Sequence, residues 1–233
     1  MALPELPAAL LPWALSAVGA APKQGAMVHT VAGDASNRRY YRLAFEGASR
    51  VLVHAPPESE NNRAFLQVAA LLARGGVRVP QVEAVDLDRG FMVLEDLGDQ
   101  LLLPALDEAS AAGYYRQAFE LLLRMSAMEL PDDGFPAYNE ALLSEELSRF
   151  GQWFVTAMLG YQPDDEELLL LQDFFQRLTD SALEQPRVFV HRDFHSRNLM
   201  LLPEDELAVI DFQDAVLGPV TYDLVSLLRD CYI

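Results

Sequence analysis

Three polar residues near the end of the chain have the types and order that phosphoryl transfer requires. Asn198 follows Asp193 by five positions, and Asp211 follows Asn198 by thirteen (211 minus 198). Phosphoryl transfer needs a carboxylate that orients and deprotonates the attacking hydroxyl, then an amide and a second carboxylate that hold Mg²⁺ against the triphosphate. We therefore predict Asp193 as the catalytic base, Asn198 and Asp211 as metal ligands, and ATP and Mg²⁺ as cofactors.

The surrounding residues support this interpretation. The segment HRDFHSRN, residues 191–198, has the Asp-to-Asn spacing of a protein-kinase catalytic loop, and Asp211-Phe212 takes the place of the metal-binding D-F-G. Apolar runs at 188–190, 199–202 and 207–210 predict short buried strands around the loop. The alternative is a polar surface turn, which would have to match both motifs by accident. His191 is included in the catalytic set, in a packing and orienting role more than as a proton carrier.

Composition limits the classes of protein that this chain can represent. Its 233 residues, 51% of them hydrophobic, are enough for a sizeable core in one large or two small domains. The formal charge of −18 argues against nucleic acid or an anionic membrane as a partner. The one cysteine, Cys231, excludes an internal disulfide and a cysteine-based zinc site. The sequence does not indicate the oligomeric state.

The first 21 residues superficially resemble the apolar region of a secretion signal. They lack a basic start, carry Glu5 and are interrupted by prolines, so we predict a short amphipathic helix over Pro12–Val18, leaning on the first lobe. No other apolar run approaches the length of a membrane span. These features predict a cytoplasmic protein.

Periodicity predicts an α+β, bilobal, protein-kinase-like fold. The first part is predicted to form strands at 28–31, 38–45, 50–54, 80–85 and 91–94, separated by turns, with one helix at 61–74. Helical spacing dominates 106–130, 139–159 and 164–183. We expect an N-lobe at 1–97 with an antiparallel sheet and one helix, a hinge at 94–98, and a mostly helical C-lobe at 99–233. The C-lobe is predicted to be incomplete, since the chain ends within an apolar helical pattern.

Four segments resemble the aminoglycoside phosphotransferase family of kinase-like small-molecule kinases: GDASNRRYYRL, FMVLEDLG, HRDFHSRNLM and VIDFQDAVLGPVTYDLVSLLRDCYI. The resemblance covers essentially the whole chain. Within the family, it is strongest to the bacterial kinases that phosphorylate N-acetylmuramic acid and N-acetylglucosamine at C1 in cell-wall recycling. It implies a kinase-like fold, dependence on ATP and Mg²⁺, and a small-molecule sugar as the partner.

The resemblance also implies residues that bind the nucleotide. Ser36 and Asn37 lie in the loop before the second strand, which is predicted to cover the nucleotide. Glu95 and Leu97 resemble hinge residues whose main-chain groups contact adenine. Asp223 matches a residue that supports the catalytic segment; a helix N-cap is the second role considered for it, and the two roles are compatible.

One kinase feature is missing from the chain. Kinases hold the α- and β-phosphates with a lysine on the third strand, but the single lysine here, Lys23, precedes the first strand. Val53 or His54 occupies the corresponding place. Arginines must then contribute the charge, and Arg38 and Arg42 are predicted to share one strand face. We select Arg42 as the phosphate ligand and leave surface solvation open for Arg38 and Arg39.

The acceptor is predicted to contact the helical segment SEELSRFGQW and the catalytic loop. Glu146, Arg149 and Trp153 have the spacing of one helical face, and Arg197 lies in the loop. The alternative is that the aromatic residues of this segment belong to the core.

Two other functions remain open. The many carboxylates would suit a cationic aminoglycoside antibiotic, and the missing lysine would suit a catalytically inactive regulator that only binds nucleotide. A regulated protein kinase does not fit, because residues 213–217 leave no room for an activation segment and no A-P-E follows.

Overall fold

The computed structural model describes residues 6–19, 26–31, 37–45, 47–131 and 134–233. The chain forms two compact units. The first comprises 1–118, 195–214 and 232–233, and the second comprises 119–194 and 215–231. The lobe boundary near residue 98 stays a prediction, because the units mark compactness and not function. No helix among the described residues is long and apolar enough to cross a membrane.

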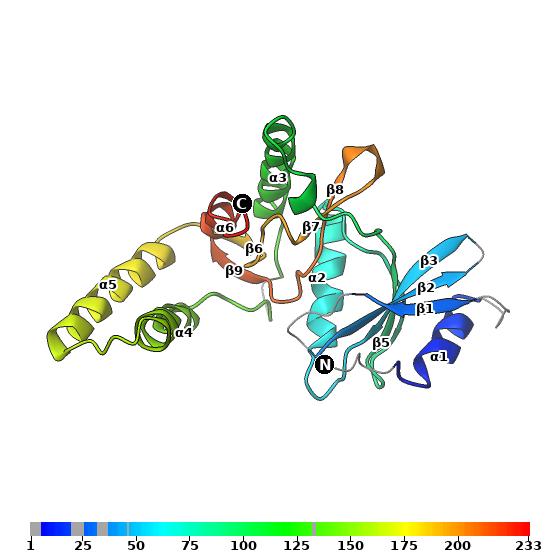
Figure 1. Ribbon diagram of the computed structural model, residues 1–233, viewed down its shortest axis with the longest axis horizontal. Helices are drawn as coiled ribbons and strands as arrows, with labels where there is room; N and C mark the ends of the chain where they lie inside the picture. Colours follow the sequence, from blue (N-terminus) through cyan, green and yellow to red (C-terminus); the bar gives the residue numbers. More distant parts are fainter. Residues whose placement is uncertain (1–5, 20–25, 32–36, 46, 132–133) are drawn as a thin grey trace. The chain divides into compact units, whose positions relative to one another are not determined.

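A five-stranded antiparallel sheet dominates the first unit (Figure 1). Its spatial order is β1-β2-β3-β5-β4, with strands at Met27–Thr30 (β1), Arg39–Phe45 (β2), Ala48–His54 (β3), Val82–Asp86 (β4) and Phe91–Glu95 (β5). All five predicted strands are confirmed to within a few residues. They form because short runs rich in apolar, β-branched and aromatic residues suit a pleated sheet, and turn residues separate these runs.

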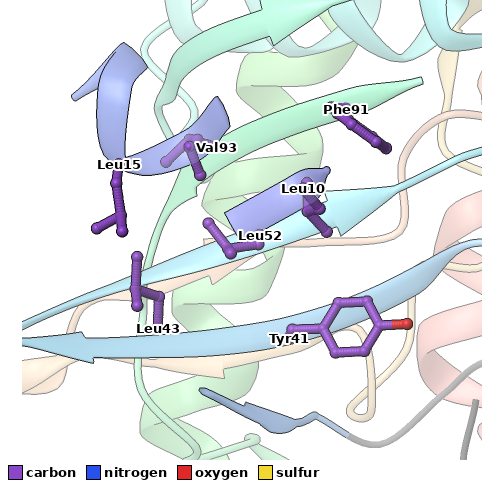
Figure 2. Packing of buried hydrophobic residues seen from close by; sticks show 8 residues of the cluster. Leu10, Leu15, Tyr41, Leu43, Leu52, Phe91 and Val93 are labelled. Carbon is purple, nitrogen blue, oxygen red and sulfur yellow. The ribbon is translucent and has the colours of Figure 1, made fainter. Parts of the chain in front are cut away.

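The N-terminal helix α1, Leu10–Ala17, packs against one face of this sheet. Figure 2 shows Leu10 and Leu15 of the helix beside Leu43 and Leu52 of the sheet. All four side chains are at most 8% exposed, so the helix closes part of the hydrophobic core. The predicted amphipathic helix is confirmed, two residues earlier than expected.

Helix α2, Asn62–Arg74, has clear start and stop signals. The side chain of Asn61 accepts a hydrogen bond from a backbone N–H of the first turn, and Gly76 takes the left-handed conformation (φ 71°) just past the end. Phe65 and Leu72 are buried at helical spacing. The helix predicted at 61–74 is therefore confirmed.

The first unit also holds a small hairpin that carries the two predicted metal ligands at its base. Strand β7, Leu199–Leu201, pairs antiparallel with β8, Leu207–Val209. The short helices η1, Leu103–Ala105, and η3, Pro203–Asp205, lie in the connecting segments. Helix α3, Ala111–Ser126, begins in the first unit and ends in the second, and is shorter than the segment 106–130 predicted for it.

The second unit is mainly helical, as predicted for the C-lobe. It contains α4 at Glu140–Arg149, the π-helix η2 at Phe150–Met158, α5 at Asp165–Leu183, α6 at Tyr222–Leu228, and strands β6 at Arg187–Val190 and β9 at Val216–Pro219, which pair antiparallel. Asn139 and Asp164 cap α4 and α5 through their side chains. The single α-helix expected over 139–159 is wrong in its second half, because the helix widens to π geometry at Phe150.

Candidate phosphoryl-transfer site

Asp223 anchors the start of the catalytic loop. Its carboxylate accepts hydrogen bonds from the backbone N–H of His191 (2.6 Å) and of Arg192 (2.9 Å). Asp223 is only 4% exposed, and this burial raises the pKa of its carboxyl group, although His191 and the two N–H groups act in the opposite direction. The residue at the N-cap of α6 is Thr221. Asp223 thus has the supporting role that the family resemblance implied, and the N-cap alternative is wrong.

His191 shapes the turn that presents Asp193. The imidazole is fully buried, its Nδ1 accepts a hydrogen bond from the backbone N–H of Asp193 (3.3 Å), and its ring meets the Phe194 ring edge-on. Between them, Arg192 adopts a positive φ of 81°, which is uncommon for a residue with a side chain. Asp193 itself is exposed. The geometry supports an orienting role for His191, and its inclusion in the catalytic set stays a prediction.

A half-buried polar network surrounds Glu146. Its Oε1 accepts a hydrogen bond from Arg192 Nη2 at 2.6 Å, and its Oε2 accepts from the hydroxyls of Tyr138 and Tyr222. Burial raises the pKa of the Tyr138 hydroxyl far above its ordinary range, and the hydrogen bond to Glu146 adds to this effect. The sequence did not identify either tyrosine as part of the site, because neither forms a local motif with Glu146.

The predicted acceptor residues of the second unit differ in their surroundings, and their contact with the acceptor stays a prediction. Glu146 is engaged in the network, whereas Arg149 is exposed and pairs with Glu145 at 3.1 Å. Trp153 lies in η2 and is 63% exposed. Because η2 is π-helical, the α-helical spacing assumed for 146, 149 and 153 does not hold across Phe150. The alternative that the aromatic residues are core is wrong for Phe150, Trp153 and Phe154, which are all exposed.

The two predicted metal ligands lie side by side in the first unit. Asn198 directly precedes β7, Asp211 follows β8 after Ile210, and the backbone N–H of Ile210 donates to the Asn198 carbonyl at 3.1 Å. Asp211 has a positive φ of 61° and accepts a hydrogen bond from Gln213 Nε2 at 2.7 Å. One amide and one carboxylate are hard oxygen donors of the kind that Mg²⁺ uses together with water and substrate phosphates. The donor set therefore fits the expected ion.

Arg197 belongs to the same unit as the metal ligands. Its guanidinium lies over the ring of Tyr232, 4.6 Å from the ring centre. Its predicted contact with the acceptor is untested and stays a prediction.

The predicted hinge residue Glu95 is held by residues outside the hinge. The Glu95 carboxylate pairs with Arg78 at 2.5 Å, which lowers the pKa of Glu95, and its backbone N–H donates to Gln81. A hollow of about 880 Å³ opens beside Glu95 and Leu97. Neither of the predicted metal ligands, Asn198 and Asp211, lines this hollow. The predicted adenine contacts of Glu95 and Leu97 stay predictions.

The Arg42 guanidinium also binds residues in and next to the predicted hinge. Its Nε and Nη2 donate to the two oxygens of Asp96 (2.6 and 2.9 Å), its Nη1 donates to Asp99 (2.6 Å), and Nη2 also donates to the Gly98 carbonyl. These partners use every N–H-bearing nitrogen of the guanidinium. The phosphate contact predicted for Arg42 stays a prediction, although the structure gives this side chain different partners.

Arg38, directly before β2, is buried in the structure. Arg38 is 2% exposed, so surface solvation is wrong for it. Its Nε lies 3.1 Å from Glu60 Oε2, and the backbone N–H of Asn37 donates to Glu60 Oε1 at 3.0 Å. Ser36, also predicted to bind nucleotide, lies outside the described residues.

The sequence of the chain was compared with models of protein families. A model of a phosphotransferase enzyme family matches residues 28–233, from β1 to the last residue. The chain belongs to this phosphotransferase family. The match confirms the resemblance found in the sequence, and its range includes the loop at 191–198, the predicted metal ligands and the predicted hinge.

The phosphotransferase chain also has similar relatives. It is 43% identical over 200 residues to the N-acetylmuramate/N-acetylglucosamine kinase of Pseudomonas putida, and 44% identical to that of Pseudomonas aeruginosa. Both alignments cover 86% of this chain but 58% and 59% of the relatives. The kinase of the same name from Neisseria meningitidis is 39% identical over 206 residues, which is 87% of this chain and 61% of the relative. The chain therefore spans about three fifths of the length of these relatives.

Solved structures of other phosphotransferases share the fold. A choline kinase from Streptococcus pneumoniae superposes with a TM-score of 0.66 at 18% identity, over 94% of this chain and 73% of its own. An aminoglycoside-3'-phosphotransferase of type VIII gives 0.60 at 18% identity, over 89% and 78%. These likenesses confirm the kinase-like fold.

Proposed function

We propose that this protein is a kinase that uses ATP and Mg²⁺ to phosphorylate the anomeric hydroxyl of N-acetylmuramic acid and N-acetylglucosamine. The identity of 43–44% to kinases named for these two sugars carries the proposal. The presence of Asp193, Asn198 and Asp211 in the order that phosphoryl transfer requires supports it.

The proposed roles follow from the chemistry of each side chain. Asp193 is exposed on a loop that Asp223 and His191 hold by hydrogen bonds, so its carboxylate is available to orient the acceptor hydroxyl and take its proton. Asn198 and Asp211 would hold Mg²⁺. Bound ATP and Mg²⁺ supply the phosphoryl group and neutralise its charge.

A turnover assay tests the proposal. We expect ADP formation that depends on either amino sugar and yields an acid-labile C1 phosphate, detected by ³¹P NMR. Methyl glycosides, whose C1 oxygen is blocked, should give no ADP. Kanamycin serves as the competing acceptor, because the aminoglycoside kinases of the family act on such amines.

Two other outcomes of these assays would indicate a different function. Efficient phosphorylation of kanamycin with both amino sugars ignored would replace the sugar assignment with the antibiotic one. Nucleotide binding in a thermal-shift assay, with no turnover of any acceptor, would favour the inactive regulator.

A further inference from the structure

We propose that Arg38, held by Glu60, binds the α- and β-phosphates of the nucleotide in place of the missing third-strand lysine. The inference rests on the proposed ATP dependence and adds a phosphate-binding residue to it. Its ligand class is a nucleoside di- or triphosphate.

Strand pairing puts Arg38 next to the vacant position. In the antiparallel register of β2 and β3, Arg39 lies opposite His54. Arg38, one residue earlier, therefore lies beside the end of β3, where Val53 or His54 takes the place of the kinase lysine. A positive charge is thus present at this end of the sheet, but the residue directly before β2 carries it.

Glu60 supplies the acidic partner that the kinase lysine also has. In kinases, that lysine pairs with a glutamate of the neighbouring helix, and here Glu60 lies two residues before α2, which starts at Asn62. The side chains of Arg38 and Glu60 are 3% and 12% exposed. Burying such a pair is costly, and its net contribution to stability is often small. A role in positioning a ligand accounts for its presence better than stability does.

The same carboxylate connects Arg38 to the loop that is predicted to cover the nucleotide. Glu60 Oε2 contacts Arg38, while Glu60 Oε1 accepts the backbone N–H of Asn37 at the end of that loop. One side chain therefore fixes both the guanidinium and the point where the loop joins β2.

A stack of rings links Arg38 to the metal ligands within the first unit. The Arg38 guanidinium lies 5.0 Å from the centre of the Phe65 ring, and this ring stacks on Phe212 with centres 5.1 Å apart and planes at 27°. Phe212 directly follows Asp211, the predicted Mg²⁺ ligand. A phosphate ligand and a metal ligand must both reach the same triphosphate, and this stack keeps the two segments together.

Arg42, the residue selected from the sequence, is the poorer candidate. Asp96, Asp99 and the Gly98 carbonyl engage its guanidinium at the hinge. Moving it to a phosphate would leave the buried Asp96 carboxylate, 4% exposed, without this partner. The planar guanidinium of Arg38, which contacts Glu60 through Nε, has the bidentate geometry that suits phosphate oxygens.

Calorimetric titration of three ligands tests the proposal. Arg38→Gln should weaken the binding of Mg-ATP and of ADP by about tenfold or more, which is the scale of a lost charge-assisted hydrogen bond. It should leave the affinity for adenosine, which has no phosphate, unchanged. Arg63→Gln is the matched control, because it removes an exposed arginine from the first turn of α2. It should bind all three ligands as the wild type does. Arg42→Gln should change the affinities for ATP and for adenosine by the same factor.

A second pair of variants separates phosphate binding from folding. Arg38→Gln leaves Glu60 as a buried charge, whereas the double variant Arg38→Met with Glu60→Gln removes both charges. The double variant should also lose affinity for ATP but not for adenosine. Arg38→Lys should recover part of the ATP affinity. If the double variant lost affinity for adenosine and for ATP equally, the pair of Arg38 and Glu60 would have a purely structural role, and the inference would be overturned.

The wild type distinguishes this inference from the function on which it rests. If wild-type protein binds Mg-ATP and Arg38→Gln binds it equally well, the inference is wrong and the proposed function is unaffected. If wild-type protein binds neither Mg-ATP nor ADP, both are wrong.

Discussion

The Glu146 carboxylate and the Arg192 guanidinium form an ion pair of 2.6 Å, which ties helix α4 to the residue directly before Asp193. Both side chains are about one-fifth exposed, and the hydroxyls of Tyr138 and Tyr222 complete the network. Glu146 therefore contacts the catalytic loop, whereas the sequence analysis assigned it to the acceptor.

This ion pair predicts how loss of Glu146 affects the protein. Glu146→Ala should lower the free energy of unfolding by about 1.5–3 kcal/mol, the scale of a hydrogen bond to a charged group. It should lower kcat and leave the KM for the sugar nearly unchanged, because it misplaces the loop. Steady-state kinetics and thermal unfolding measure both effects.

The neighbouring Glu145 supplies the control for that experiment. Glu145→Ala breaks only the exposed pair with Arg149, so it should change stability by no more than about 0.5 kcal/mol. A raised sugar KM in Glu146→Ala, with kcat and stability intact, would return Glu146 to the acceptor site.

Asp193→Asn should abolish most turnover and spare nucleotide binding. The amide cannot accept the proton of the acceptor hydroxyl, and loss of a general base typically costs about 10²–10⁴-fold in rate. The Kd for Mg-ATP should stay at the wild-type value, because the base acts on the acceptor. Asp214→Asn, which changes another exposed carboxylate in the same way, is the control. Near-normal turnover in Asp193→Asn would show that another residue is the base.

Asp211→Ala should weaken the binding of Mg-ATP itself. The change removes a charged metal ligand, so a higher Mg²⁺ concentration should be required for half-maximal nucleotide binding. Adenosine, which needs no metal, should bind as it does to wild type. An unchanged Mg²⁺ requirement would contradict the assignment of Asp211 as a ligand.

Asp223→Ala should destabilise the catalytic loop. It leaves the backbone N–H groups of His191 and Arg192 without their acceptor, and each unsatisfied buried group costs about 1–3 kcal/mol. Asp223→Asn keeps one acceptor oxygen and should lose less. Hydrogen exchange of the two amides, followed by NMR, measures the effect locally. Protection of both amides in Asp223→Ala equal to that in wild type would refute the anchoring role.

The Arg78–Glu95 pair predicts acid sensitivity at the hinge. The hydrogen bond from Arg78 lowers the pKa of folded Glu95 below its ordinary value of 4.5, so the unfolded chain takes up the proton first as the pH falls. The stabilisation is fully present above pH 4.5 and is lost as the pH falls through the folded-state pKa. Glu95→Gln should thus have a lower Tm than wild type at pH 7, and the difference should shrink towards pH 3. A constant difference in Tm would show that the pair contributes no linkage.

Local sequence signals were sufficient for the secondary structure around the site. The strands β1 to β5 could be predicted because short apolar runs and the turn residues between them are properties of neighbouring positions. Asn61 and Gly76 mark the ends of α2 for the same reason. The π-helix after Arg149 could not be predicted, because no local pattern separates it from a continued α-helix.

The motif itself was also readable, since Asp193, Asn198 and Asp211 have a diagnostic order within nineteen positions (193 to 211). The partners of the charged side chains were decided only by the tertiary structure. The chain has 35 acidic but 17 basic residues, so each arginine could pair with many carboxylates, and the sequence favours none of them. Arg38 pairs with Glu60, Arg42 with Asp96, and Arg192 with Glu146, 22, 54 and 46 positions apart in the chain. Ion pairing depends on distance in space and on burial, which arise only when the strands and helices pack together.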